Sequence, residues 1–159
     1  MQAKMLGRTT VFTARQIAGL QSVLAQRGFN RTQIGQMTGP IAALARAGGT
    51  GNRGQDILVA ADVVSNIMRA MQLEFTKTGH VADVLTAAVN ESNFTLQDLM
   101  NSMQLSAPVA AQYGMSLEEL VATLGAMRNL GIDPGIAGTG LRNLFLKASN
   151  AKNVQKLNS

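Results

Sequence analysis

The residues with the most specific chemical potential form a glycine-rich segment in the first third of the chain. Gly49, Gly51 and Gly54 match the G-x-G-x-x-G spacing of dinucleotide-binding loops, and Glu74 falls near the position of the acidic residue that binds the ribose. Such a site needs a strand before the loop and a helix after it, so that backbone N–H groups meet the pyrophosphate. Here a helical apolar pattern precedes the loop. The sequence therefore predicts a flexible loop between two helices and no nucleotide site.

The other candidate groups are one histidine and two adjacent glutamates. His80 is the only histidine, and Asp83 follows on the same face of the predicted helix, as in pairs that orient a general base. No nucleophile is marked nearby, so we interpret His80 as a polar residue near a helix start. Glu118 and Glu119 lie in the first turn of a predicted helix, where negative charge favours the helix dipole. We therefore assign no catalytic, cofactor-binding or metal-binding residue, and we expect neither enzymatic activity nor a small-molecule substrate.

The composition excludes several classes of protein. The chain has 159 residues and no cysteine, which rules out disulfide frameworks and thiolate zinc sites. Hydrophobic residues make up 46% and charged residues 14%, a balance that argues against intrinsic disorder. No apolar run approaches the ~18–20 residues that cross a bilayer, and the first residues lack the apolar core of a secretory signal. These features predict a soluble intracellular protein.

Charge is distributed in bands along the chain. The formal net charge is +5, yet every residue with an ionised side chain before Asp56 is basic, and all nine acidic residues lie between Asp56 and Asp133. The basic first third is compatible with nucleic-acid binding through phosphate contacts, and this class remains the alternative function. No helix–turn–helix or row of aromatic residues supports it, so we favour a solvated face that pairs with the acidic band of a neighbouring copy.

The elements that must position these residues are helices. Apolar side chains recur at helical spacing in seven segments, which cover residues 13–28, 30–47, 56–71, 81–88, 95–114, 116–131 and 133–148. Thr13, Asn30, Thr95 and Ser116 have the residue types and spacing of N-caps with a partner three residues later. Pro40 predicts a kink or a division into two short helices. The predicted fold is all-α, a compact bundle of six to eight short amphipathic helices.

The expected organisation is a lead-in over residues 1–12, one helical domain over 13–149 and a frayed polar tail over 150–159. A weak internal echo links 13–28 with 116–131, because both begin with a capping box and end at a glycine. This echo is compatible with helical repeats, but any two capped helices of four turns would show it, and we favour that simpler interpretation.

Several segments together resemble the core region of tape measure proteins of tailed phages. The matching segments run in the same order over about residues 10–149 and comprise 12–18 (FTARQIA), 25–29 (AQRGF), 60–64 (AADVV), 81–93 (VADVLTAAVNESN), 108–114 (PVAAQYG), 116–119 (SLEE) and 131–142 (GIDPGIAGTGLR). The last segment is the most distinctive, and it departs from the family pattern at Gly140, where alanine is usual. This departure weakens the expected start of the last helix.

The resemblance implies a structural role in phage tail assembly. Tape measure proteins are long helical chains around which the tail tube polymerises, so that chain length sets tube length. Self-association and contacts with the tail tube protein, tail assembly chaperones and tail tip proteins are implied, with the protein in the host cytoplasm during assembly and then in the virion tail. Because the resemblance covers only the core region, we interpret the chain as an excised domain or prophage remnant whose Met1 need not be a natural start.

Overall fold

The computed structural model describes the backbone of residues 12–157 and the side chains of residues 12–150. Except for Phe12, the expected lead-in lies outside this range, as do residues 158–159 of the expected tail. The described residues form seven α-helices and one 3₁₀ turn. These are α2 (Ala14–Gln26), α3 (Arg31–Gly48), α4 (Arg53–Ala70), η1 (Phe75–Lys77), α5 (Thr78–Glu91), α6 (Leu96–Gln112), α7 (Leu117–Asn129) and α8 (Pro134–Leu157). The predicted all-α class, with six to eight helices, is confirmed.

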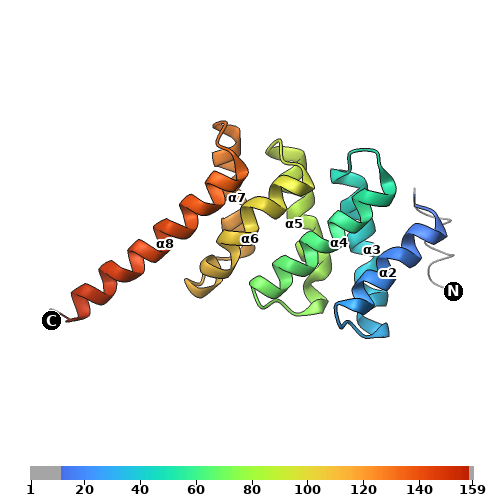
Figure 1. Ribbon diagram of the computed structural model, residues 1–159, viewed down its shortest axis with the longest axis horizontal. Coiled ribbons are helices and arrows are strands. Elements are labelled where there is room, and N and C mark those ends of the chain that lie inside the picture. Colours follow the sequence, from blue (N-terminus) through green and yellow to red (C-terminus); the bar gives the residue numbers. More distant parts are fainter. Residues whose placement is uncertain (1–11, 158–159) are drawn as a thin grey trace.

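The helices follow one another along the long axis of the molecule, with α2 and α8 at opposite ends of the row (Figure 1). The most extensive packing joins helices two apart in sequence, namely α6 with α8, α3 with α5, and α4 with α6. Helices α2, α4, α6 and α8 therefore form one layer and α3, α5 and α7 the other, with α3 also packed on α4. This alternation is typical of stacked helical repeats, in which each unit contacts only its neighbours.

Four helices begin with the capping box that the sequence predicts. The side chains of Thr13, Asn30, Thr95 and Ser116 each accept a hydrogen bond from the backbone N–H three residues later, and the side chain at that later position accepts one from the cap. Each box satisfies two backbone donors that a helix start would otherwise leave unpaired. The four helix starts are thus determined locally.

The helices end with an equally regular turn. After α2, Gly28 has φ +90°, its N–H donates to Ala25 O, and the N–H of Phe29 donates to Leu24 O. This is the Schellman geometry, which needs a left-handed residue followed by an apolar one. The same pair of hydrogen bonds closes α4, α6 and α7, where the left-handed residues are Gln72, Gly114 and Gly131. Asn93, also at positive φ, precedes buried Phe94 after α5.

The apolar residue that follows each left-handed position anchors the connection in or against the core. Phe94 is buried, and Phe29, Met115 and Ile132 are partly buried against the core. Phe12 occupies the equivalent position before Thr13 and is 2% exposed. Phe12 is therefore part of the helical core, although the sequence analysis assigned it to a lead-in.

Several expectations for the helices differ from the structure. Helix α3 is continuous from Arg31 to Gly48 with Pro40 inside it, so it is one helix and not two. The third predicted helix begins at Arg53 instead of Asp56, and a 3₁₀ turn precedes α5, which is longer than expected at both ends. Helix α8 continues to Leu157, beyond its predicted end near residue 148. Apolar periodicity detects the buried stretch of a helix, and exposed polar turns extend it without that signal.

The two similar segments, residues 13–28 and 116–131, form helices that lie in different layers. Helix α2 lies in the layer of α4, α6 and α8, whereas α7 lies in the layer of α3 and α5. The similarity of the two segments reflects a shared capping box and a shared glycine turn, because these local devices recur at most connections.

A glycine in α8 permits close contact with the backbone of α6. A Cβ atom added to Gly138 in α8 would lie 2.2 Å from the backbone oxygen of Ser102 in α6. Ala137 and Leu141, on the same side of α8, are buried. At Gly140, by contrast, an added Cβ would meet no atom within 4 Å. The family-typical alanine would therefore fit at residue 140, and the helix start is intact with glycine there.

Two glycine substitutions in α8 are expected to act in opposite directions. Gly138→Ala forces α8 away from the backbone of α6 and should lower the free energy of unfolding by about 2–3 kcal/mol. Gly140→Ala adds helix propensity without a clash and should raise it by about 1 kcal/mol. Urea denaturation followed by circular dichroism measures both. Equal stability of Gly138→Ala and the parent chain would contradict the close contact.

Candidate functional site

The glycine-rich segment is the short connection between α3 and α4. Helix α3 ends at Gly48 and α4 begins at Arg53, so a helix precedes the loop, as the sequence predicts. Asp56, which is 6% exposed, accepts hydrogen bonds from the backbone N–H and the hydroxyl of Thr50 and from the N–H of Gly51. An added Cβ at Gly49 would lie 2.6 Å from Oδ2 of Asp56. The loop N–H groups that a phosphate would need are thus engaged by a carboxylate.

This arrangement differs from the flexible loop expected from the sequence. Asp56 lies in the first turn of α4, where the helix N-terminus favours a negative charge. It accepts three hydrogen bonds from the loop, and together they fix the path of the chain from α3 into α4. The role of Asp56 is to brace a helix connection.

His80 pairs with Glu118 and not with Asp83. Nε2 of His80 in α5 lies 2.5 Å from Oε1 of Glu118 in α7, and both side chains are about half exposed. The pKa of Glu118 is lowered, first because its own backbone N–H donates to the carboxylate and further because of the contact with His80, while burial acts in the opposite direction. The pair joins α5 to α7 on an exposed surface.

Two further ion pairs join helices. Arg27, at the C-cap of α2, contacts Asp62 in α4, and Nη2 of Arg128 in α7 lies 3.5 Å from Oδ2 of Asp98 in α6. Arg27 belongs to the basic band and Asp62 to the acidic band, so this bridge between the bands lies within one chain. Pairs at partly exposed positions each contribute little stability. They favour particular helix neighbours over others.

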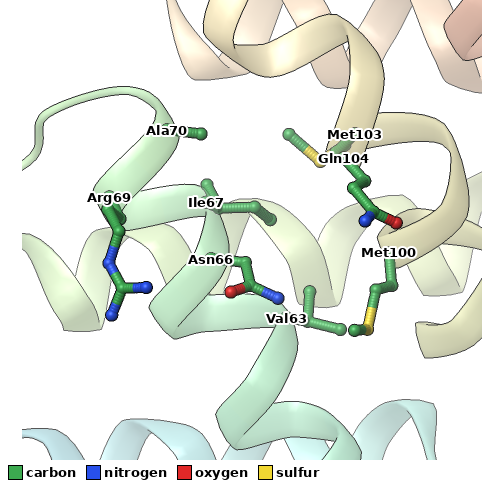
Figure 2. Close-up of a pocket in the computed structure, with 8 residues that line it drawn as sticks. All are labelled: Val63, Asn66, Ile67, Arg69, Ala70, Met100, Met103 and Gln104. Carbon is green, nitrogen blue, oxygen red and sulfur yellow. The ribbon is translucent and has the colours of Figure 1, made fainter. Parts of the chain in front are cut away.

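A groove lies between α4 and α6 (Figure 2). Its volume is about 250 Å³. It is lined by Val63, Asn66, Ile67, Arg69 and Ala70 from α4 and by Met100, Met103 and Gln104 from α6. The side chains of Met100 and Met103 approach it from opposite ends (Figure 2).

The groove has the chemistry of a contact surface. Its lining is mainly apolar, it contains no carboxylate, hydroxyl or imidazole, and its single charged residue is Arg69. The volume lies below the usual range of small-molecule sites, about 300–1,000 Å³. Methionine side chains adapt their shape to a neighbour. The groove suits one apolar side chain of a protein partner better than a substrate.

The described residues contain no group of three or more His, Cys, Asp or Glu side chains placed to hold a metal ion. Nor does any helix in the described part of the chain have the length and apolarity needed to cross a membrane. The molecule as described presents helix surfaces, short connections and inter-helix ion pairs. These features define a helical structural module.

The comparisons with known proteins agree with that class. The model of the phage-related minor tail protein family matches residues 1–158, and the chain belongs to this family. The tape measure protein of Pneumococcus phage Dp-1 is 37% identical over 142 residues, which are 89% of this chain and 12% of that protein. A probable tape measure protein of Escherichia phage P2 is 31% identical over 141 residues, which are 89% of this chain and 17% of that protein.

The resemblance to tape measure proteins is thereby confirmed, and the chain is a phage tail structural protein and a virion component. It spans only a small part of the length of the relatives it matches. No solved structure matches it.

Sequence reasoning missed the bracing role of Asp56 and the α4–α6 groove. Asp56 was predicted as a helix start, and its position one turn after a glycine-rich loop is the only local signal for its contacts. The groove has no such signal, because its two walls are separated by α5 in the chain and meet only through the packing of alternate helices.

Removal of the Asp56 carboxylate should destabilise the fold. Asp56→Ala leaves three loop donors without their acceptor and should lower the free energy of unfolding by about 2–3 kcal/mol. Asp56→Asn retains one acceptor oxygen and should lie between Asp56→Ala and the parent. Asp83→Ala, at an exposed aspartate of α5, is the matched control and should change stability by less than about 0.5 kcal/mol. Equal loss in both alanine variants would refute the bracing role.

The lowered pKa of Glu118 predicts a pH-dependent contribution to stability. A carboxyl group whose pKa is lower in the folded state stabilises the fold above its unfolded pKa, about 4.3, and loses this effect as pH falls through the folded pKa. Glu118→Gln should therefore unfold at slightly lower urea concentration than the parent at pH 7, and the difference should vanish towards pH 3. A difference that grows on acidification would show that the sign is wrong.

Proposed function

We propose that this chain is the core-region module of a tape measure protein and takes part in scaffolding the tail tube and setting its length. The family match over residues 1–158, together with two relatives named as a tape measure protein and a probable one, is the observation that carries the proposal. The whole protein's role is transferred here from relatives of which the chain covers 12% and 17%.

The architecture supports a role in which length matters. Helices α2 and α8 lie at opposite ends of the row, and most packing is between near neighbours in sequence (Figure 1). In such a row, addition or removal of a helix pair changes the extent of the protein without rebuilding a shared centre. The described surface offers exposed helix faces and a shallow apolar groove, which suit contacts with other tail components.

We further propose that the role is non-enzymatic and that the partners are other tail components: the tail tube protein, tail assembly chaperones and tail tip proteins, in addition to copies of the chain itself. The support is the structural character of the family. The site of assembly would be the host cytoplasm before incorporation into the virion. Proposed domain bounds remain residues 13–149 for the packed module, extended at its start by buried Phe12.

A deletion that respects the repeated turns tests the function in the phage or prophage genome that encodes the chain. Gln72 and Gly114 occupy equivalent left-handed positions, so removal of residues 73–114 joins Gln72 directly to Met115 and Ser116. Because this deletion removes one helix pair from the row, the variant should form tails shorter than those of the parent. Electron microscopy of assembled tails provides the measurement.

The matched control is Asp83→Ala in the same genome, which changes an exposed residue of α5, preserves chain length and should preserve tail length. Tails of unchanged length in the deletion variant would refute a length-setting role for this segment. Tubes that polymerise normally when residues 12–157 are deleted as a block would refute the scaffold role.

A further inference from the structure

The outer face of α8 is an apolar surface that no other described helix covers. We define it as Ile136, Gly140, Asn143, Leu144 and Lys147 of α8 together with the N-cap residue Asp133. Their spacing places them on one stripe of the helix, away from Ala137, Gly138 and Leu141, which face α6. Ile136 is 67% exposed and Leu144 is 60% exposed. A shallow hollow of about 470 Å³ lies over Asp133, Ile136, Gly140 and Asn143.

Among the described residues, the opposite end of the row, at α2, has no matching apolar surface. All large apolar side chains that are exposed among the described residues lie at or beyond Leu105, and four of the six follow Asn129. The described part of α2 therefore offers no apolar counterpart to the outer face of α8. Head-to-tail association of copies would leave Ile136 and Leu144 against a polar helix, whereas association of two outer faces would cover both.

The outer face of α8 is complementary to itself. Ile136 and Leu144 lie four residues before and after Gly140, and Asp133 and Lys147 lie seven residues before and after it. An antiparallel pair of α8 helices that cross at Gly140 therefore brings Ile136 of each copy to Leu144 of the other. The same pairing brings Asp133 of each copy, exposed at the helix start, close to Lys147 of the other. A two-fold interface requires this kind of self-complementarity.

Small residues at the crossing point permit close approach. Gly140 carries no side chain, and Thr139 beside it is small and exposed. A Cβ at Gly140 would meet nothing within 4 Å, so the space outside the helix is open. Close helix contacts favour such positions, with larger apolar side chains on either side.

We propose that the outer face of α8 binds the outer face of α8 in a second copy of this chain, antiparallel and with two-fold symmetry about Gly140. The inference rests on the self-association included in the proposed function and names its surface. One helix pair buries less than the about 1,200 Å² of a stable interface, so the dimer exchanges readily and depends on concentration.

Covalent trapping tests the two-fold geometry. The chain has no cysteine, so Gly140→Cys introduces a single thiol at the proposed crossing point, where the fold has room for it. Mild oxidation, or a short bifunctional maleimide, should convert this variant to a covalent dimer. Ala87→Cys, at an exposed position of α5, is the control and should remain monomeric under the same conditions. Absence of dimer from Gly140→Cys, or equal dimer from both variants, would overturn the proposal.

Sedimentation equilibrium tests two questions separately: whether the chain self-associates, and whether it does so through the outer face of α8. The parent chain should associate with rising concentration, and Ile136→Asp should weaken this association at least about tenfold. Leu105→Asp, at an exposed leucine of α6 outside the face, should leave it unchanged. Association that Ile136→Asp does not weaken refutes the surface and leaves self-association standing. A parent chain that stays monomeric refutes both and assigns the face to another occupant. Neither result depends on tail length, which tests the assembly function separately.

Discussion

The rest of this structure depends on one short connection, in which a left-handed residue is followed by an apolar anchor and then by a helix cap. The connection closes the preceding helix by Schellman hydrogen bonds at Gly28, Gly114 and Gly131, and a residue that caps the following helix comes two positions later in each case. Its few residues leave the chain little freedom, so each helix must reverse beside the previous one. Repetition of the device produces a row of helices with alternate layers.

The position of a helix in this row determines how many of its sides are covered by neighbouring helices. Interior helices such as α4 and α6 are covered on two sides by helices of their own layer, and Gly138 of α8 permits close contact with the backbone of α6. The other described helices cover α8 on one side only. On its uncovered side, the apolar residues Ile136 and Leu144 are exposed. Exposed apolar side chains of this kind are typical of protein contact surfaces.

Polar and charged groups in this fold serve mainly to specify the packing. Asp56 braces the α3–α4 connection, Arg27 and Asp62 join α2 to α4, and His80 and Glu118 join α5 to α7. His80 and Glu118, which are candidates for acid–base chemistry by residue type, therefore pair with each other and join two helices. Their arrangement agrees with membership in a family of phage tail proteins.

The amino-acid sequence by itself determined the local features of this protein: the helical class, the four capping boxes and most helix stretches, because each depends on residues within a turn or two of one another. The family resemblance was equally accessible, since it depends on segment order. Only the tertiary structure decided which partner His80 takes, that Asp56 braces a loop, and that α8 extends to Leu157. Those outcomes depend on which helices become neighbours, and neighbours two helices apart are brought together by packing that no local pattern encodes.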